Sequence, residues 1–307
     1  MTLTTVAGGL EFPEGPIALD DGSVLLVEIK RGTLTRVAPD GTTAVVAETG
    51  GGPNGAAIGP DGAVYVCNNG GFSWTTRRGL TAPGPQPAEY IGGRIQRVTL
   101  DGEVSDLYTH VDGNGLRGPN DLVFDAHGGF WFTDMGKTRK RETDLGGLYY
   151  ATADGSRITE VVHPLNAPNG VGLSPDGSRV YVAETITGRL WWWDIAEPGR
   201  VRPNADSWAP HGGTLLHGFP GLQWLDSLAV DAEGNVCVAT LYSGCVSVVS
   251  PEGDLLETVP VPDGDIFVTN ICFGGPDLRT AYITSSGTGI LYSTPWPRPG
   301  LALNHTA

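Results

Sequence analysis

The chain has 307 residues, of which 40% are hydrophobic and 17% are charged, and it carries a net charge of −15 with a pI near 4.7. So acidic a chain argues against nucleic acid or an anionic membrane as a partner and suits a neutral small molecule or a cation. The 46 glycines and 23 prolines are typical of many short strands joined by turns rather than of long helices.

The beginning of the chain, residues 1–5, lacks the basic region followed by an apolar region that marks a secretory signal. No apolar run reaches about 18 residues, so no membrane span is expected. The four cysteines lie in apolar runs whose spacing matches no zinc site, which predicts buried free thiols. They are Cys67, Cys237, Cys245 and Cys272. We therefore expect a cytoplasmic enzyme or binding protein.

One unit recurs six times along the chain. Each copy has a polar residue, an apolar run, an Asp/Gly turn and a second apolar run, which is the pattern of a hairpin. A repeat of roughly 40 to 65 residues, with room for four short strands, is the period of propeller blades. Six such blades bury their faces against one another in a ring, so we expect an all-β six-bladed propeller forming one domain over residues 1–307. The copies open at residues 12–19, 52–58, 118–124, 167–173, 224–230 and 268–273.

Two segments fall outside the repeat. The sixth copy ends about three strands in, and the apolar residues 4–7 form a strand candidate without a partner, so we expect this N-terminal strand to close the ring beside the last blade. The longest insertion, about residues 71–91, is rich in Gly and Pro and contains Phe72, Trp74 and Tyr90. Such a segment suits either a lid over a pocket or a plain surface loop.

The polar residues at the starts of the six copies carry the functional prediction. Because the first strand of each propeller blade lines the central channel, these side chains are expected around one mouth of that channel. Their carboxylate and amide oxygens suit a hard cation such as Ca²⁺ or Mg²⁺. Asn and Asp at strand starts also cap turns, which is the simpler interpretation of each one taken singly. The six are Glu14, Asn54, Asn120, Asn169, Asp226 and Asn270.

Several motifs together resemble the SMP-30/gluconolactonase/luciferin-regenerating family of six-bladed propellers. They are Pro13-Glu14-Gly15-Pro16, Pro119-Asn120-Asp121, Ala167-Pro168-Asn169-Gly170, Leu225-Asp226 and the run from Thr269 to Arg279. The resemblance implies one catalytic divalent cation, Ca²⁺ first, with Zn²⁺, Mn²⁺ and Mg²⁺ as alternatives. It also implies hydrolysis of a sugar lactone or another cyclic ester.

The resemblance also implies roles for individual residues. Glu14, Asn169 and Asp226 match the metal ligands, and Asp226 also matches the proposed proton acceptor. Asn120 matches an amide that touches metal or substrate, and with Asp121, Asn54 and Asn270 it is expected on the substrate side. Asp121 is the alternative base, although strand alternation should turn it out of the channel.

The chain departs from the family pattern in two places. Ser227 follows the last aspartate where the family usually has Gly, and Gly118 stands where a mammalian-type member has an Arg, with Arg117 one position earlier. These departures leave the substrate more open than the metal site.

Three classes of function remain after the other chemistries are removed. The chain has no Gly-x-Ser-x-Gly elbow, and its six histidines show no metal-ligand spacing. The first class is a metal-dependent lactonase or esterase acting on a small, neutral lactone. The others are a phosphotriesterase-like enzyme using the same site and a non-enzymatic ligand-binding propeller with a structural cation. A monomer or a small homo-oligomer is compatible with each.

Overall fold

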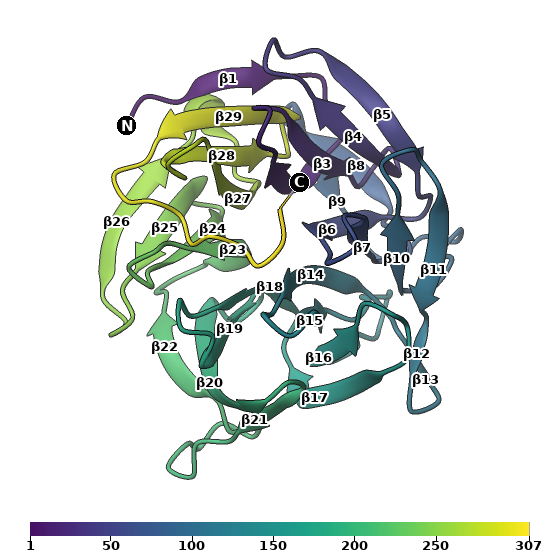
Figure 1. Ribbon diagram of the computed structural model, residues 1–307, viewed down its shortest axis with the longest axis vertical. Coiled ribbons are helices and arrows are strands. Elements are labelled where there is room, and N and C mark those ends of the chain that lie inside the picture. The colour runs from purple at the N-terminus through teal and green to yellow at the C-terminus, as the bar shows by residue number, and fades with distance from the viewer. Residues whose placement is uncertain (307) are drawn as a thin grey trace.

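The computed structural model describes residues 1–306, and its strands form six blades around a central axis (Figure 1). The predicted all-β six-bladed propeller is therefore confirmed. Within these residues the single helical element is the short 3-10 turn η1 (Pro262–Gly264), and no helix is long and apolar enough to cross a membrane.

The first three blades are antiparallel sheets of four strands. Blade 1 consists of β2 (Pro13–Ala18), β3 (Val24–Glu28), β4 (Thr33–Val37) and β5 (Thr43–Glu48). Blade 2 consists of β6 (Pro53–Ile58), β7 (Val64–Asn68), β10 (Arg94–Val98) and β11 (Val104–Tyr108). Blade 3 consists of β14 (Pro119–Phe124), β15 (Gly129–Asp134), β16 (Gly146–Thr152) and β17 (Ile158–Leu165).

The last three blades repeat the pattern with small changes. Blade 4 consists of β18 (Pro168–Leu173), β19 (Arg179–Glu184) and β20 (Arg189–Glu197), whose outer edge pairs with both β21 (Arg200–Arg202) and β22 (Thr214–Gly218). Blade 5 consists of β23 (Trp224–Val230), β24 (Val236–Leu241), β25 (Cys245–Val249) and β26 (Leu255–Pro260). Blade 6 consists of β27 (Val268–Gly274), β28 (Thr280–Ser285), β29 (Ile290–Pro295) and β1 (Thr4–Ala7).

The N-terminal strand closes the ring. β1 pairs antiparallel with β29, and Thr4 lies opposite Ser293 (Figure 1). The first residues of the chain thus supply the fourth strand of the last blade, as the unpaired N-terminal strand predicted. Closure protects the edge of β29, which would otherwise expose a row of unpaired backbone groups.

Apolar side chains fill the spaces between neighbouring blades. Between blades 2 and 3, Tyr65 packs against Phe124 with ring centroids 5.1 Å apart, and Phe130 is fully buried beside them. Truncation of such a ring to Ala costs about 3–5 kcal/mol, because the lost burial leaves a void. The four cysteines are unpaired thiols, buried except for the half-buried Cys272, in agreement with the prediction.

The six inner strands define the central channel. β2, β6, β14, β18, β23 and β27 contact one another in that cyclic order. All six start at the same end of the channel, which we call the mouth, and their hairpin turns lie at the other end. The C-terminal residues 300–306 cross that far end, where Leu301 N–H donates to the Val230 carbonyl (3.0 Å) and the Asn304 amide donates to the Phe124 carbonyl (2.8 Å).

Four short strands lie outside the blades. The insertion at 71–91 contains a hairpin of β8 (Trp74–Arg77) and β9 (Leu80–Pro83). A second small hairpin, of β12 (His110–Val111) and β13 (Asn114–Gly115), precedes blade 3. The hairpin of β8 and β9 lies beside the mouth, where Trp74 packs on Phe12.

Candidate functional site

Every inner strand carries an irregularity in its pairing near the mouth. In β2 the register shifts directly after Glu14, and in β27 the shift lies between Val268 and Asn270. In the other four strands the shift contains the polar residue itself: Asn54, Asn120, Asn169 or Asp226. In such a bulge, two residues of one strand lie opposite one residue of the partner strand, which changes the direction of their side chains. The six strands therefore present more than one residue each to the channel near its mouth.

The bulge in β14 changes the position predicted for Asp121. This residue is only 6% exposed and lines the central cavity. The expectation that alternation turns Asp121 out of the channel is therefore wrong, because the register shift between Pro119 and Leu122 interrupts the alternation.

Glu14 lies at the mouth end of β2, and only one of its two carboxylate oxygens has hydrogen-bond partners. Its side chain is 1% exposed. Oε2 accepts hydrogen bonds from the Asn270 amide (2.7 Å) and from Gly15 N–H (2.5 Å). Oε1 is buried and has no hydrogen-bond partner among the described residues. A buried carboxylate oxygen without a partner is costly, which points to a positively charged occupant beside it.

Asn120 shows the same asymmetry in blade 3. Its amide nitrogen donates to the Met135 sulfur (3.2 Å), and its Oδ1 is buried without a partner in the part of the chain that the structure describes. The nitrogen side of the amide is thus fixed against Met135, and the oxygen is left available for a ligand.

Asn169 and Asp226 meet in the next two blades. The Asn169 amide donates to Thr185 Oγ1 (3.2 Å), and its Oδ1 accepts a weak bond from Ser227 Oγ (3.4 Å). One oxygen of Asp226 accepts the Ser227 N–H (3.1 Å), and the side chain remains half-buried rather than buried. Ser227, where the family usually has Gly, therefore orients both residues.

Three carboxyl groups share this part of the channel. Burial raises the pKa of Glu14, and repulsion from Asp226 and Asp121 raises it further. Burial raises the pKa of Asp226 to about 7, while an Asn169 hydrogen bond opposes the rise and the Asp121 charge adds to it. Burial likewise raises the pKa of Asp121 to about 7 against hydrogen bonds from Leu122 and Val171 N–H. Their negative charges thus repel one another in a poorly solvated space.

No basic side chain neutralises these carboxylates. Within residues 1–306 none of the three forms an ion pair with Lys, Arg or His. Across the same residues, no three His, Cys, Asp or Glu side chains converge closely enough to hold a metal by themselves. A cation site here would need the amide oxygens of Asn120 and Asn169 beside the carboxylates, which is the oxygen-only donor set of hard cations.

Asn270 sits one step deeper than its expected ring position. In blade 6 it directly precedes Ile271, as Asp121 directly precedes Leu122 in blade 3, although Asn270 pairs with Thr284 whereas Asp121 lies within the bulge. Both side chains accept the N–H of the next residue, at 2.7 Å for Asn270 and 2.9 Å for Asp121. Asn270 therefore orients Glu14, and Thr269 takes the outer place with its hydroxyl bonded to Thr284 and Ser286.

Glycines next to the polar residues allow the strands to approach closely. A Cβ on Gly55 would lie 2.6 Å from Cα of Asp121, and a Cβ on Gly170 would lie 2.7 Å from the Leu228 nitrogen. The Asn-Gly pairs of β6 and β18 are thus explained by packing of neighbouring inner strands as well as by turn preference. Asn54 itself is 4% exposed at the start of β6.

The channel widens behind the carboxylates. A cavity of about 960 Å³ extends from Asp121 and Asn270 to the hairpin turns, and the C-terminal residues 301–306 line its far end. Its walls are largely apolar, with Ile17, Ile58 and Val171 among them. No local sequence pattern indicates this chamber, because its walls come from all six blades.

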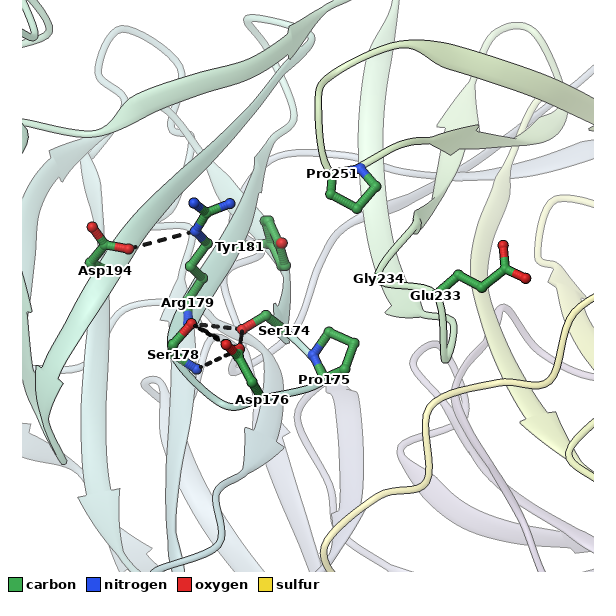
Figure 2. Close-up of a pocket in the computed structure, with 10 residues that line it drawn as sticks. All are labelled: Ser174, Pro175, Asp176, Ser178, Arg179, Tyr181, Asp194, Glu233, Gly234 and Pro251. Atoms are coloured by element: carbon green, nitrogen blue, oxygen red, sulfur yellow. Dashed lines mark hydrogen bonds and ion pairs between the residues drawn. The ribbon is translucent and has the colours of Figure 1, made fainter.

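A groove of about 330 Å³ lies away from the mouth, between the turns of blades 4 and 5 (Figure 2). Asp176 accepts hydrogen bonds from Ser174 and Ser178, and Arg179 pairs with Asp194 at 3.6 Å (Figure 2). Asp176 and the Arg179–Asp194 pair therefore have partners within the groove, unlike the Glu14 and Asn120 oxygens at the mouth.

Comparison with known proteins gives one family and several neighbours. The family model described as SMP-30/Gluconolactonase/LRE-like region matches residues 12–287. Lactonase drp35 of Staphylococcus saprophyticus is 32% identical over 254 residues, which are 80% of this chain and 68% of that protein.

Two solved structures share the fold. A gluconolactonase from Xanthomonas campestris superposes with a TM-score of 0.74 at 23% identity, covering 96% of this chain and 89% of that one. A calcium-binding protein, regucalcin, from Agrobacterium tumefaciens gives 0.70 at 19% identity, covering 95% and 92%. At these identities the likeness extends to the fold alone.

Proposed function

The chain belongs to the SMP-30/gluconolactonase/LRE-like family, and from this membership we propose that it hydrolyses a lactone with the help of one bound divalent cation. The single observation that carries the proposal is the set of buried oxygens without partners, Glu14 Oε1 and Asn120 Oδ1, next to repelling carboxylates. A divalent cation would satisfy these oxygens and cancel the repulsion at once.

The donor set fits Ca²⁺ best. Glu14, Asn120, Asn169 and Asp226 would hold the ion through two carboxylates and two amide oxygens, which suits a hard cation with six to eight oxygen ligands and leaves positions for water and substrate. The calcium-binding description of the regucalcin neighbour agrees with this choice. Mg²⁺, Mn²⁺ and Zn²⁺ remain alternatives, because oxygen ligands do not exclude them.

When bound, the cation would polarise the lactone carbonyl and stabilise negative charge on its oxygen. Asp226 would take the proton from the attacking water. One of its oxygens is engaged by Ser227 N–H, so the other is the proton acceptor. A carboxylate next to a cation has a lowered pKa and is a weakened base. Asp121, which lies close enough for its charge to raise the pKa of Asp226, is therefore the alternative general base.

The remaining polar groups would orient the reactants. Asn270 holds one oxygen of Glu14, and Met135 fixes the amide of Asn120 so that its oxygen faces away from the sulfur. Asn54 in β6 and Asp121 in the neighbouring β14 lie near the mouth ends of their strands. Together with Asn120 and Asn270 they would complete the substrate side of the site. The substrate we propose is a small, neutral lactone, and the four free thiols support a cytoplasmic location.

A pH-indicator assay on a panel of lactones, with a chelator and metal add-back, tests the proposal. Lactone turnover that EDTA abolishes and Ca²⁺ restores is the expected result. Turnover of phosphotriesters alone would contradict it in favour of phosphotriesterase chemistry. Tight Ca²⁺ binding without turnover of either panel would instead identify a ligand-binding propeller.

A further inference from the structure

The insertion at residues 71–91, which we call the strap, runs along the mouth. It leaves blade 2 after Asn69, and its hairpin reaches blade 6, where Thr81 N–H donates to the Gly287 carbonyl (2.9 Å). On the way, the Trp74 ring packs on Phe12 with centroids 5.1 Å apart. Phe12 stands two residues before Glu14, so the strap passes directly beside the candidate site.

Aromatic rings continue this contact on both sides. Phe12 also packs on Phe267 of blade 6, with centroids 6.1 Å apart, and Phe72 lies 6.3 Å from Trp74. Phe72, Trp74 and Phe267 are half-buried, whereas Phe12 is 4% exposed. The rings form a continuous apolar arc along the edge of the mouth next to β2, β6 and β27.

A buried lysine holds the base of the strap. Lys137 is 2% exposed, and its Nζ donates to Asn69 Oδ1 (3.0 Å) and to the Gly71 carbonyl (2.8 Å). The ammonium also lies 3.9 Å from the ring centroid of Phe72 and 5.5 Å from that of Tyr90. Two hydrogen bonds and two aromatic faces thus stabilise one desolvated charge.

Lys137 also connects the strap to the site. It follows β15 and stands two residues after Met135, whose sulfur accepts the Asn120 amide. The return side of the strap rests on the same loop, because Gln86 N–H donates to the Thr138 carbonyl (2.9 Å). Burial lowers the pKa of Lys137 to about 7, and the nearby Asp134 carboxylate opposes that shift.

We propose that Lys137 is a positioning residue that fixes the strap as an apolar wall of the mouth, and that this wall makes the site select lactones with an apolar substituent. Only the substrate preference rests on the proposed lactone hydrolysis; the positioning role of Lys137 does not. A sugar lactone carries several hydroxyls that need hydrogen-bond partners, and a wall of Phe72, Trp74 and Phe267 offers aromatic faces instead. An alkyl or aryl group gains free energy by covering those faces.

Limited proteolysis tests the positioning role without any substrate. Arg77 and Arg78 are exposed in the hairpin of the strap and provide a trypsin site. Lys137→Met should speed cleavage after these residues about tenfold, because the strap opens more often. Lys137→Arg, which keeps the charge, should restore part of the protection, and Lys140→Met, an exposed lysine on the same loop, should change nothing. Equal cleavage rates in Lys137→Met and the unmodified chain would overturn the role.

Steady-state kinetics test the preference for lactones with an apolar substituent. The unmodified chain should turn over a lactone with an aryl or alkyl substituent with at least about tenfold higher kcat/KM than a polyhydroxylated lactone of equal ring size. Lys137→Met and Trp74→Ala should raise KM for the substituted lactone by a larger factor than they lower its kcat, whereas Lys140→Met should leave both constants unchanged. Preference for the polyhydroxylated lactone would overturn the apolar wall while lactone hydrolysis stands. If no lactone reacts, the proposed function fails and the proteolysis result still decides the role of Lys137.

Discussion

The two ends of the central channel use the same residue types in opposite ways. At the far end, each of the six hairpin turns contains an aspartate whose Oδ1 accepts the backbone N–H two residues later, at 2.8–3.2 Å. At the mouth, Glu14 Oε1 and Asn120 Oδ1 have no partner among residues 1–306. The six turn residues are Asp21, Asp61, Asp125, Asp176, Asp231 and Asp277.

The pKa shifts separate the two ends as well. Hydrogen bonds from Ser174 and Ser178 lower the pKa of Asp176 to about 2, whereas burial raises the pKa of Asp226 to about 7. The loop around Asp176 stabilises its anion, whereas the Asp226 carboxylate has no positively charged partner among the described residues. The comparison teaches that surroundings rather than residue type mark the functional end of the propeller.

Glu14→Gln should have the largest effect of any substitution at the mouth on cation binding and turnover. The substitution keeps the shape but removes one of the two negative charges that would hold the cation, so we expect loss of Ca²⁺ binding and a fall in turnover of about a thousandfold or more. Calorimetric titration with Ca²⁺ and the lactone assay measure the two effects. Asp176→Asn is the matched control at the far end and should leave both unchanged; an equal loss in the two variants would remove the distinction between the ends.

Asp226→Asn should separate binding from chemistry. The amide keeps one oxygen for the cation but cannot accept a proton, so we expect weakened Ca²⁺ binding and a fall in kcat of about a hundredfold to ten-thousandfold. Turnover measured at saturating Ca²⁺ isolates the chemical step. An unchanged kcat under those conditions would transfer the role of base to Asp121.

Most of this contrast could be predicted from the sequence. The Pro-Asp-Gly and Asp-Gly turns follow from local turn chemistry, and the repeat of the polar residue before each apolar run predicts a common mouth. Glu14 was the most informative residue, since Glu suits neither a turn nor a strand.

The remainder depended on tertiary structure. The bulge that brings Asp121 into the channel has no local signature beyond the Asn-Asp pair, and alternation gave the wrong direction. Asn270 could have been placed by aligning Ile271 with Leu122 and Leu228, the apolar residues that resume regular pairing. Lys137 lies 66 residues along the chain from its partner Gly71, and no local sequence pattern predicts that contact.

Asn270→Ala tests the support of Glu14. The substitution removes the amide that holds Glu14 Oε2, so the carboxylate loses its orientation without losing its charge. We expect Ca²⁺ affinity to fall by about ten- to a hundredfold, as for other groups that orient a metal ligand. Isothermal titration gives this value directly, and an unchanged affinity would show that Gly15 N–H alone fixes Glu14.

The pH dependence of cation binding sharpens the comparison further. A carboxyl whose pKa is raised in the fold destabilises the native state as pH rises above its unfolded value of about 3.8, and for Asp226 the loss is complete above about 7. Ca²⁺ binds the ionised form and restores that stability, so its addition should raise the melting temperature more at pH 8 than at pH 5. Equal shifts at both pH values would contradict a cation site that includes the Asp226 carboxylate.

The smallest effect belongs to the far end and has the opposite sign. The pKa of Asp176 is lowered to about 2, so its stabilisation is present above its unfolded value of about 3.8 and is lost as pH falls through 2. Asp176→Asn should therefore lower the free energy of unfolding at pH 7 by less than about 1 kcal/mol, because the group is exposed and screened. Urea titrations at pH 7 and pH 2.5 should show this difference shrinking with acid. A loss that instead grew as the pH fell would mean that Asp176 resembles the mouth carboxylates, and the contrast between the two ends would disappear.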